Sequence, residues 1–357
     1  MSEFLDARRA SAISRRRFLK GAFSAFVGAR FLSPLPLRLF AEVKKSEDMG
    51  KAPVARSAET APFAEVVDIR SSSWRTEEGV VDSPQIAGML ERGLVGLTGK
   101  SSPEEAWKSL FSQGEKVGIK FNKVSRNHTR ANQAILEALV AGLESAGVSR
   151  ADIYPAEAAG TSLSGLGEAD FSKGPEVNFG AGETALSRFL VEQVDCFISV
   201  ADLKDHNRAG ITGSLKNISH AGGTVMKDPW KFHGNHCSPY VGAICSIPEL
   251  KSKRRLNITN GLIGVYKGGP GTSNPSFYFA HGGFLLSTDP VAVDRVAWEL
   301  LDRARKERGL LPLMESDSKP IHVLEASKMG LGVDDLSQIR WSVLDERLTF
   351  PDAKVVR

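Results

Sequence analysis

The stretch K-V-G-I-K-F-N, residues 116–122, decides the fold class, because apolar and polar residues alternate in it as they do in a β-strand. Apolar residues then recur at helical spacing between Ile135 and Leu143, and Gly147 ends that helix. A second strand is expected at residues 152–155. Strand, helix and strand in this order predict a β-α-β unit, whose two strands run parallel and are joined by a right-handed crossover.

The same alternation continues to the end of the chain. Further strands are expected at residues 195–200, 255–263, 284–286 and 339–344, and further helices at 183–192, 239–247, 321–329 and from Pro290 onward. Asp289 predicts that the long helix begins at Pro290, because an aspartate side chain accepts hydrogen bonds from the first N–H groups of a helix. Together the elements predict an α/β fold with a mostly parallel sheet and helices on both faces. Whether it forms one lobe or two is left open.

A leader is predicted at the N-terminus. Residues 14–20, S-R-R-R-F-L-K, match the twin-arginine export pattern S-R-R-x-F-L-K at every fixed position, and a short apolar run follows at 21–28. We therefore expect residues 1–41 to be a Tat signal peptide, the Tat export machinery to be a partner, and the protein to be periplasmic or otherwise exported. No stable membrane span is expected, because the apolar run is shorter than the roughly 20 residues that cross a bilayer. Residues 42–63 are predicted to be a linker and 64–357 the folded domain.

Charge and cysteine content exclude several classes of protein. Of 46 basic and 42 acidic residues, residues 1–41 hold eight and two, which leaves 38 and 40 for the rest of the chain. The folded part is therefore nearly neutral, and nucleic acid is not expected as a partner. The chain has 3 cysteines and no C-x-x-C pair, which excludes a disulfide scaffold and a cluster held by four thiolates.

Side chains that bind ligands crowd between residues 201 and 237, beginning where the predicted strand 195–200 ends. Open α/β sheets bind ligands at the carboxyl ends of their strands. Four of the 7 histidines lie in this segment: His206, His220, His233 and His236. Imidazole nitrogens suit zinc, iron, nickel or copper, so all four are candidate ligands of a transition metal. The alternative is that these histidines hydrogen-bond the backbone of loops.

Residues 212–217, T-G-S-L-K-N, favour a different ligand, namely an anion. A glycine-containing turn that enters a helix presents free backbone N–H groups, with which the Thr212 hydroxyl and the Lys216 ammonium can converge on a phosphate or carboxylate. The spacing is not that of a P-loop. Lys204 and Lys216 would also oppose a bare cation, so metal binding and anion binding remain alternatives here.

Several motifs in order resemble one known family. They are V-G-I-K-F-N at 117–122, L-K-D-H at 203–206, L-K-N at 215–217, G-G-P at 268–270, D-P-V-A-V-D at 289–294 and G-L-G at 330–332. With them the chain resembles the DUF362 family, which is named for its unknown function. The resemblance implies an exported member of that family and supplies no reaction. It also implies a set of ligand-binding residues: Lys120, Asn122, Lys204, Asp205, Thr212, Lys216, Asn217 and Asp294.

These features predict an exported protein that binds a metal or metallocofactor and a small anion in a cleft at the strand ends. Neither a Ser-His-Asp order, nor paired catalytic carboxylates, nor a G-x-G-x-x-G motif is recognisable, so no catalytic residue is assigned and whether the protein is an enzyme stays open. The alternative is a non-catalytic periplasmic binding protein for a ligand that bears a carboxylate or a phosphate.

Overall fold

The computed structural model describes residues 63–124, 130–221, 223–225 and 229–345. The predicted signal peptide 1–41 and the linker up to residue 62 lie outside the described residues. Every described residue belongs to one compact unit of the chain. Within these described residues, the contacts define one unit rather than two lobes.

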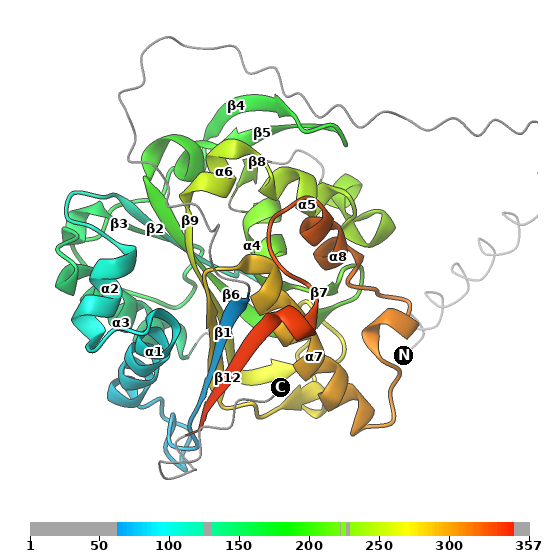
Figure 1. Cartoon of the computed structure of the whole chain (residues 1–357), viewed down its shortest axis with the longest axis horizontal. Helices are drawn as coiled ribbons and strands as arrows, with labels where there is room; N and C mark the ends of the chain where they lie inside the picture. The colour runs from blue at the N-terminus through cyan, green and yellow to red at the C-terminus, as the bar shows by residue number, and fades with distance from the viewer. Residues whose placement is uncertain (1–62, 125–129, 222, 226–228, 346–357) are drawn as a thin grey trace, which may run out of the picture. The chain divides into compact units, whose positions relative to one another are not determined.

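A nine-stranded mixed sheet forms the centre of this unit (Figure 1). Its strand order is β12-β1-β11-β9-β6-β2-β3, with β7 beside β6 and β10 beside β9. The strands are β1 (Ala64–Arg70), β2 (Val117–Phe121), β3 (Ile153–Ala156), β6 (Cys196–His206), β7 (Gly210–Ile211), β9 (Arg254–Val265), β10 (Tyr278–Phe279), β11 (Gly283–Ser287) and β12 (Ile339–Asp345). The pairs β1–β12, β2–β3, β2–β6 and β6–β9 are parallel, which confirms the mostly parallel sheet.

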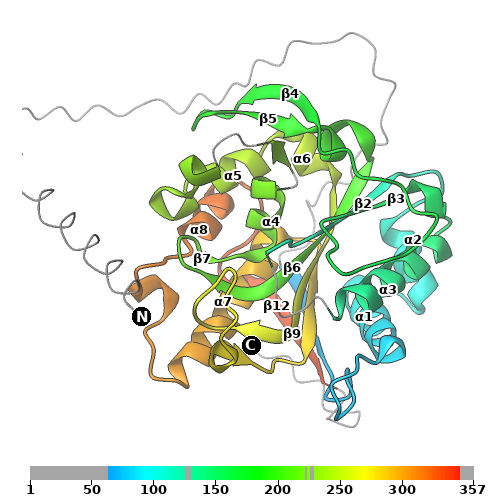
Figure 2. The same cartoon turned by 180° about the vertical axis from the view of Figure 1, so that it is seen from behind.

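Helices cover both faces of the sheet, as Figures 1 and 2 show. The helices of one face are α1 (Ser83–Thr98), α2 (Pro103–Leu110) and α3 (Asn132–Ser145). Those of the other side are α4 (Gly213–Ala221), α5 (Tyr240–Cys245), α6 (Pro248–Lys253), α7 (Pro290–Lys306) and α8 (Ile321–Lys328). Short 3-10 turns lie at Arg150–Asp152, Pro229–His233, Asn235–Cys237, Pro275–Phe277, Leu313–Glu315 and Leu336–Gln338. Separate apolar cores on the two sides, one around Ile119 and one around Leu215, hold these layers together.

Segment 183–192 departs from the predicted helix. It forms β5 (Glu183–Ser187) followed by a π-helical turn at Phe189–Gln193. β5 lies between β4 (Lys173–Asn178) and β8 (Thr224–Val225) in a small second sheet. Because the spacing of apolar residues here suits a short strand as well as a helix, hydrogen bonds to strands outside the segment decide the outcome.

The strands that carry the predicted site lie side by side. β2 and β6 are parallel, with Phe121 opposite Val200. β6 continues beyond the end of β2 to His206 and pairs there with β7. α4 begins at Gly213, directly after β7, and packs back onto β6. The carboxyl ends of β2 and β6 and the start of α4 therefore meet at one end of the sheet.

None of the described helices is long and apolar enough to span a bilayer.

Candidate functional site

A network of buried polar groups joins the ends of β2 and β6 to α4. Lys120 has no exposed surface. Its Nζ donates to the Phe121 carbonyl at 2.6 Å, to Glu157 Oε2 at 2.7 Å and to Asn217 Oδ1 at 3.2 Å. Asn217 Nδ2 donates in return to the Lys120 carbonyl at 3.0 Å and to Ser199 Oγ at 3.1 Å. Burial lowers the pKa of Lys120, and the Glu157 carboxylate opposes that shift.

Lys204 is held by similar contacts farther along β6. Its Nζ donates to Asn122 Oδ1 at 2.9 Å and to the Val124 carbonyl, and it lies 3.5 Å from Asp202 Oδ2. Burial lowers the pKa of Lys204, whereas Asp202 raises it. Because every one of these partners is part of the protein, Lys204 and Asn122 form an internal network.

Two of the predicted ligand-binding aspartates accept hydrogen bonds from backbone N–H groups. Asp205 Oδ1 accepts from Gly269 N at 2.7 Å, and burial raises the pKa of Asp205 to about 6. Asp294 of α7 accepts from Ser214 N at 2.6 Å and from Leu215 N at 3.0 Å, and burial raises its pKa to about 7. These two N–H groups belong to the first turn of α4. The N-terminus that the sequence predicts to be free for an anion is therefore occupied by the Asp294 carboxylate.

Thr212 and Lys216 differ from the other six predicted ligand-binding residues. Thr212 is 3% exposed and Lys216 is 8% exposed. Thr212 Oγ1 is buried and has no hydrogen-bond partner in the described part of the chain. Burial lowers the pKa of Lys216 to about 8, and no hydrogen bond contributes to that shift. An unpaired buried hydroxyl is costly, so Thr212, together with the largely buried Lys216, is available to a ligand.

His220, His233 and Cys237 bring together three donor atoms of the kind that bind metals. One donor atom of each residue lies within 4.8 Å of the other two. His220 belongs to α4, whereas His233 and Cys237 belong to the two turns that follow it. The two imidazole rings meet edge to face, with centroids 4.7 Å apart and an angle of 71° between their planes. Because nitrogen lone pairs lie in the ring plane, crossed rings can direct them at one ion.

The surroundings of His220 fit a metal ligand. Its Nδ1 lies 2.8 Å from Ser219 Oγ, whose hydroxyl donates to the Lys216 carbonyl at 3.4 Å. Nδ1 can therefore carry the ring proton and leave Nε2 for an ion, which is how metal-binding histidines are usually oriented. Nε2 lies 3.2 Å from the Phe232 carbonyl, a contact that an ion would replace. Burial holds the pKa of His220 well below its usual 6.5, so the ring is neutral.

The turn that carries Cys237 has an unusual backbone. Asn235, His236 and Cys237 have φ angles of 46°, 56° and 64° in succession. Non-glycine residues pay about 1–2 kcal/mol each for this left-handed conformation, and such residues cluster at functional sites. Burial raises the pKa of the Cys237 thiol to about 11, but a coordinated metal ion removes the thiol proton outright.

His206 and His236, the other two predicted metal ligands, are not members of this group. Nδ1 of His206 accepts from two backbone N–H groups, those of Arg208 at 3.1 Å and Ala209 at 3.3 Å. Nδ1 of His236 accepts from Lys319 N at 3.3 Å. Each of these rings thus has one nitrogen engaged by the backbone.

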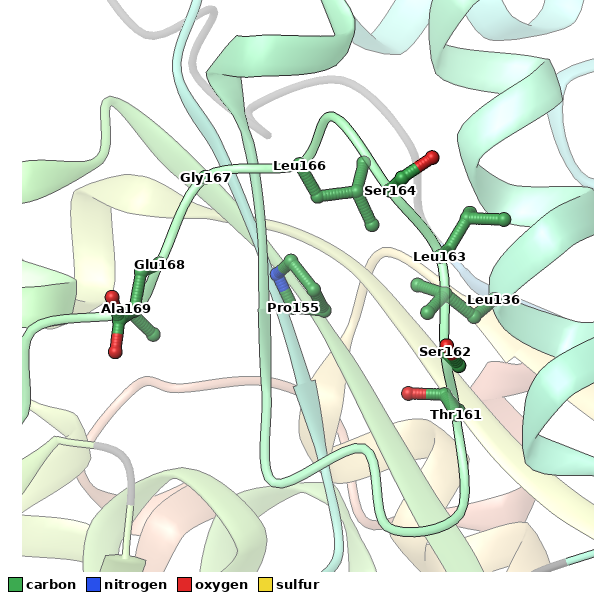
Figure 3. A pocket seen from close by; sticks show the side chains of 10 residues that line it. All are labelled: Leu136, Pro155, Thr161, Ser162, Leu163, Ser164, Leu166, Gly167, Glu168 and Ala169. Carbon is green, nitrogen blue, oxygen red and sulfur yellow. The ribbon is translucent and has the colours of Figure 1, made fainter.

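A cavity of about 430 Å³ lies elsewhere in the fold (Figure 3). Leu136 of α3, Pro155 of β3 and the loop 161–169 line it. Its polar groups are the hydroxyls of the loop and the Glu168 carboxylate. The lining includes none of the predicted ligand residues, so this cavity is not the cleft that the sequence predicts.

One part of the chain matches a known protein family. That part contains Lys204, Lys216, Asp294 and the donor group His220, His233 and Cys237. Residues 154–299 match the family model of DUF362, a domain of unknown function. This match supports the DUF362 family for the chain. A crystal structure of a Thermotoga maritima protein, a structural-genomics target, is similar with a TM-score of 0.41 and 10% identity, over 64% of this chain and 60% of that chain. No curated protein matches the chain.

Sequence reasoning missed two residues in the DUF362 segment and one beyond it. Cys237 is a donor in the metal-type group, and its only signal in the sequence is its place beside His236. Glu157 pairs with Lys120 and has a φ of 55°, for which the sequence has no signal. His322 of α8 is fully buried, and its ring lies against the backbone of Ala209. Burial, together with Lys216, lowers the pKa of His322 to about 3.

Proposed function

We propose that this DUF362-type chain is an exported protein that binds a transition metal through His220, His233 and Cys237, and a small anion beside it through Lys216. The observation that carries the proposal is the convergence of two imidazoles and a thiol within 4.8 Å. Nitrogen and thiolate donors favour zinc or copper over magnesium or calcium. Three protein ligands leave one position free, as in catalytic zinc sites rather than structural ones.

The export part of the proposal is supported by the twin-arginine motif at residues 14–20. The Tat pathway carries proteins that have already folded. A metal can therefore be bound in the cytoplasm, before the protein is exported. The nearly neutral charge of the folded part agrees with a small-molecule ligand rather than nucleic acid.

Metal analysis of the folded protein tests the proposal. After loading with Zn²⁺ and gel filtration, mass spectrometry of the eluted protein should find one zinc ion per chain. Cys237→Ser and His233→Ala should each lose most of it, because two donors hold a metal far more weakly than three. Cys245→Ser and His236→Ala are matched controls, since neither residue belongs to the donor group, and both should keep the metal. Equal zinc in all five proteins would contradict the proposal.

A second function is favoured by one observation. Thr212 Oγ1 is buried without a partner among the described residues, and burial rather than a hydrogen bond is the largest cause of the pKa shift of Lys216. A non-catalytic binding protein for a carboxylate or phosphate would use these two groups alone. In that case phosphate would stabilise chelator-treated protein against heat, and the zinc analysis above would find no stoichiometric metal.

A further inference from the structure

We propose that the anion occupies the free coordination position of the metal, and that Thr212, Lys216 and His206 hold it there. The inference rests on the proposed function and adds the class of ligand and its place. That class is a small molecule with an oxyanion group, either a carboxylate or a phosphate. One oxygen would bind the metal, and the remaining lone pairs would accept hydrogen bonds from the three side chains.

The positions of Thr212 and Lys216, just before α4 and within it, support this arrangement. Thr212 directly precedes the helix, and Lys216 and His220 follow at intervals of four residues. Residues four apart lie on one face of a helix, so the Lys216 ammonium and the His220 imidazole share a face of α4, and Thr212 lies immediately before the first turn of that helix. Burial raises the pKa of the Cys237 thiol, and the positive charge of Lys216 opposes that shift. Lys216 therefore lies one turn from His220 on α4 and within electrostatic range of Cys237.

His206 can donate the third hydrogen bond to the anion, because its ring proton is on the nitrogen that does not contact the backbone. Its Nδ1 accepts hydrogen bonds from the backbone N–H groups of Arg208 and Ala209, so Nδ1 carries no proton. Because Nδ1 carries no proton, the one proton of the ring is on Nε2. Nε2 is then a hydrogen-bond donor and has no lone pair for a metal. The ring stacks on that of His233, with centroids 5.5 Å apart and 20° between the planes, so this donor lies beside a proposed metal ligand.

The charge of the site requires an anion. A divalent ion and one thiolate leave a single positive charge, and the Lys216 ammonium adds a second one. Like charges that are both buried repel strongly unless a counter-ion neutralises them. The buried aspartates at this end of the fold are already engaged: Asp202 by Lys204, Asp205 by Gly269 and Asp294 by the start of α4. None of these described carboxylates is available to neutralise the site, so we take the counter-ion to be a bound small-molecule anion.

Co²⁺-loaded protein tests the inference, because the visible spectrum of Co²⁺ reports both thiolate ligation and a change of the fourth ligand. Sodium phosphate and sodium acetate are titrated separately, and the stronger response identifies the oxyanion. The spectrum should change and saturate with at least one of them. Lys216→Met, Thr212→Val and His206→Phe should each bind stoichiometric Co²⁺ and weaken the anion at least tenfold. Lys231→Met, which alters an exposed lysine of the segment that carries His233, should behave as the unaltered protein.

The outcomes separate the inference from the function on which it rests. Failure of the unaltered protein to bind Co²⁺ would overturn both. Normal Co²⁺ binding with no spectral response to either anion, or with the same anion affinity in Lys216→Met and Thr212→Val, would overturn the inference and leave the metal site standing. Thr212→Val is nearly isosteric and breaks no side-chain hydrogen bond among the described residues, so it tests the claim even if His206→Phe does not fold. Loss of Co²⁺ from a folded His206→Phe protein would show that His206 is a metal ligand instead.

Discussion

Replacing Lys216 by methionine should stabilise the protein in the absence of ligand, although it removes a proposed binding residue. Burial lowers the pKa of Lys216 from 10.5 to about 8, and the side chain is only 8% exposed. Each pKa unit corresponds to about 1.4 kcal/mol, so the buried charge costs the folded state about 3 kcal/mol. Below pH 8 Lys216 is charged in both states and the full cost applies. As the pH rises from about 8 to 10.5 the folded state loses its proton first, so the stability of the unaltered protein rises.

Urea unfolding of chelator-treated protein measures this effect. In a buffer without carboxylate or phosphate at pH 7, Lys216→Met should be more stable than the unaltered protein by about 3 kcal/mol. The difference should shrink steadily at pH 9 and pH 10, because deprotonation relieves the unaltered protein alone. Lys231→Met controls for the loss of one positive charge at an exposed site and should change stability by less than about 0.5 kcal/mol. A Lys216→Met protein that is less stable at pH 7 would show that the ammonium has a stabilising partner, and it would refute the reasoning.

Three further predictions concern the leader, the start of α4 and acid stability. Changing Arg15 and Arg16 together to lysine should hold the protein in the cytoplasm, and undiminished periplasmic protein in a fractionation experiment would exclude Tat export. Gly213 has a φ of 62°, and a Cβ there would lie 2.4 Å from Asp294 Oδ2, so Gly213→Ala should cost about 2 kcal/mol or more in urea unfolding. A cost below about 0.5 kcal/mol would contradict that packing. Burial raises the pKa of Asp68, but its ion pairs outweigh burial and lower that pKa from 3.8 to about 2. The ionised Asp68 carboxylate therefore stabilises the folded state by about 2 kcal/mol above pH 4, and this stabilisation is lost as the pH falls through 2. Asp68→Asn should remove that part of the pH dependence between pH 4 and pH 2, and an unchanged acid unfolding curve would rule it out.

Elements whose formation depends on local sequence were predictable. Asp289 begins α7 as expected, because its side chain accepts hydrogen bonds from Val291 N and Ala292 N, both at 2.8 Å. The parallel pairing of β2 with β3 also followed from the sequence, since a β-α-β unit joins two parallel strands. Segment 183–192 was not predictable in the same way, because its partners β4 and β8 lie outside it.

The candidate site was predictable in its residue types but not in its contacts. The sequence places four histidines in one short segment, yet it does not show that His220 turns toward His233 and Cys237 while His236 turns toward Lys319. These contacts depend on the return of the chain from α4 through two turns. The same limit applies to Lys216, since only the tertiary structure shows that Lys120 and Lys204 have internal acceptors, whereas no hydrogen bond contributes to the pKa shift of Lys216.

X-ray absorption at the zinc edge of the loaded protein tests the central claim most directly, because it counts the sulfur and nitrogen atoms bound to the ion. The proposed site predicts one sulfur at about 2.3 Å and two imidazole nitrogens at about 2.0–2.1 Å, completed by one oxygen. The sulfur signal should vanish in Cys237→Ser and persist in Cys245→Ser. A first shell of oxygen and nitrogen alone in the unaltered protein would contradict the metal site.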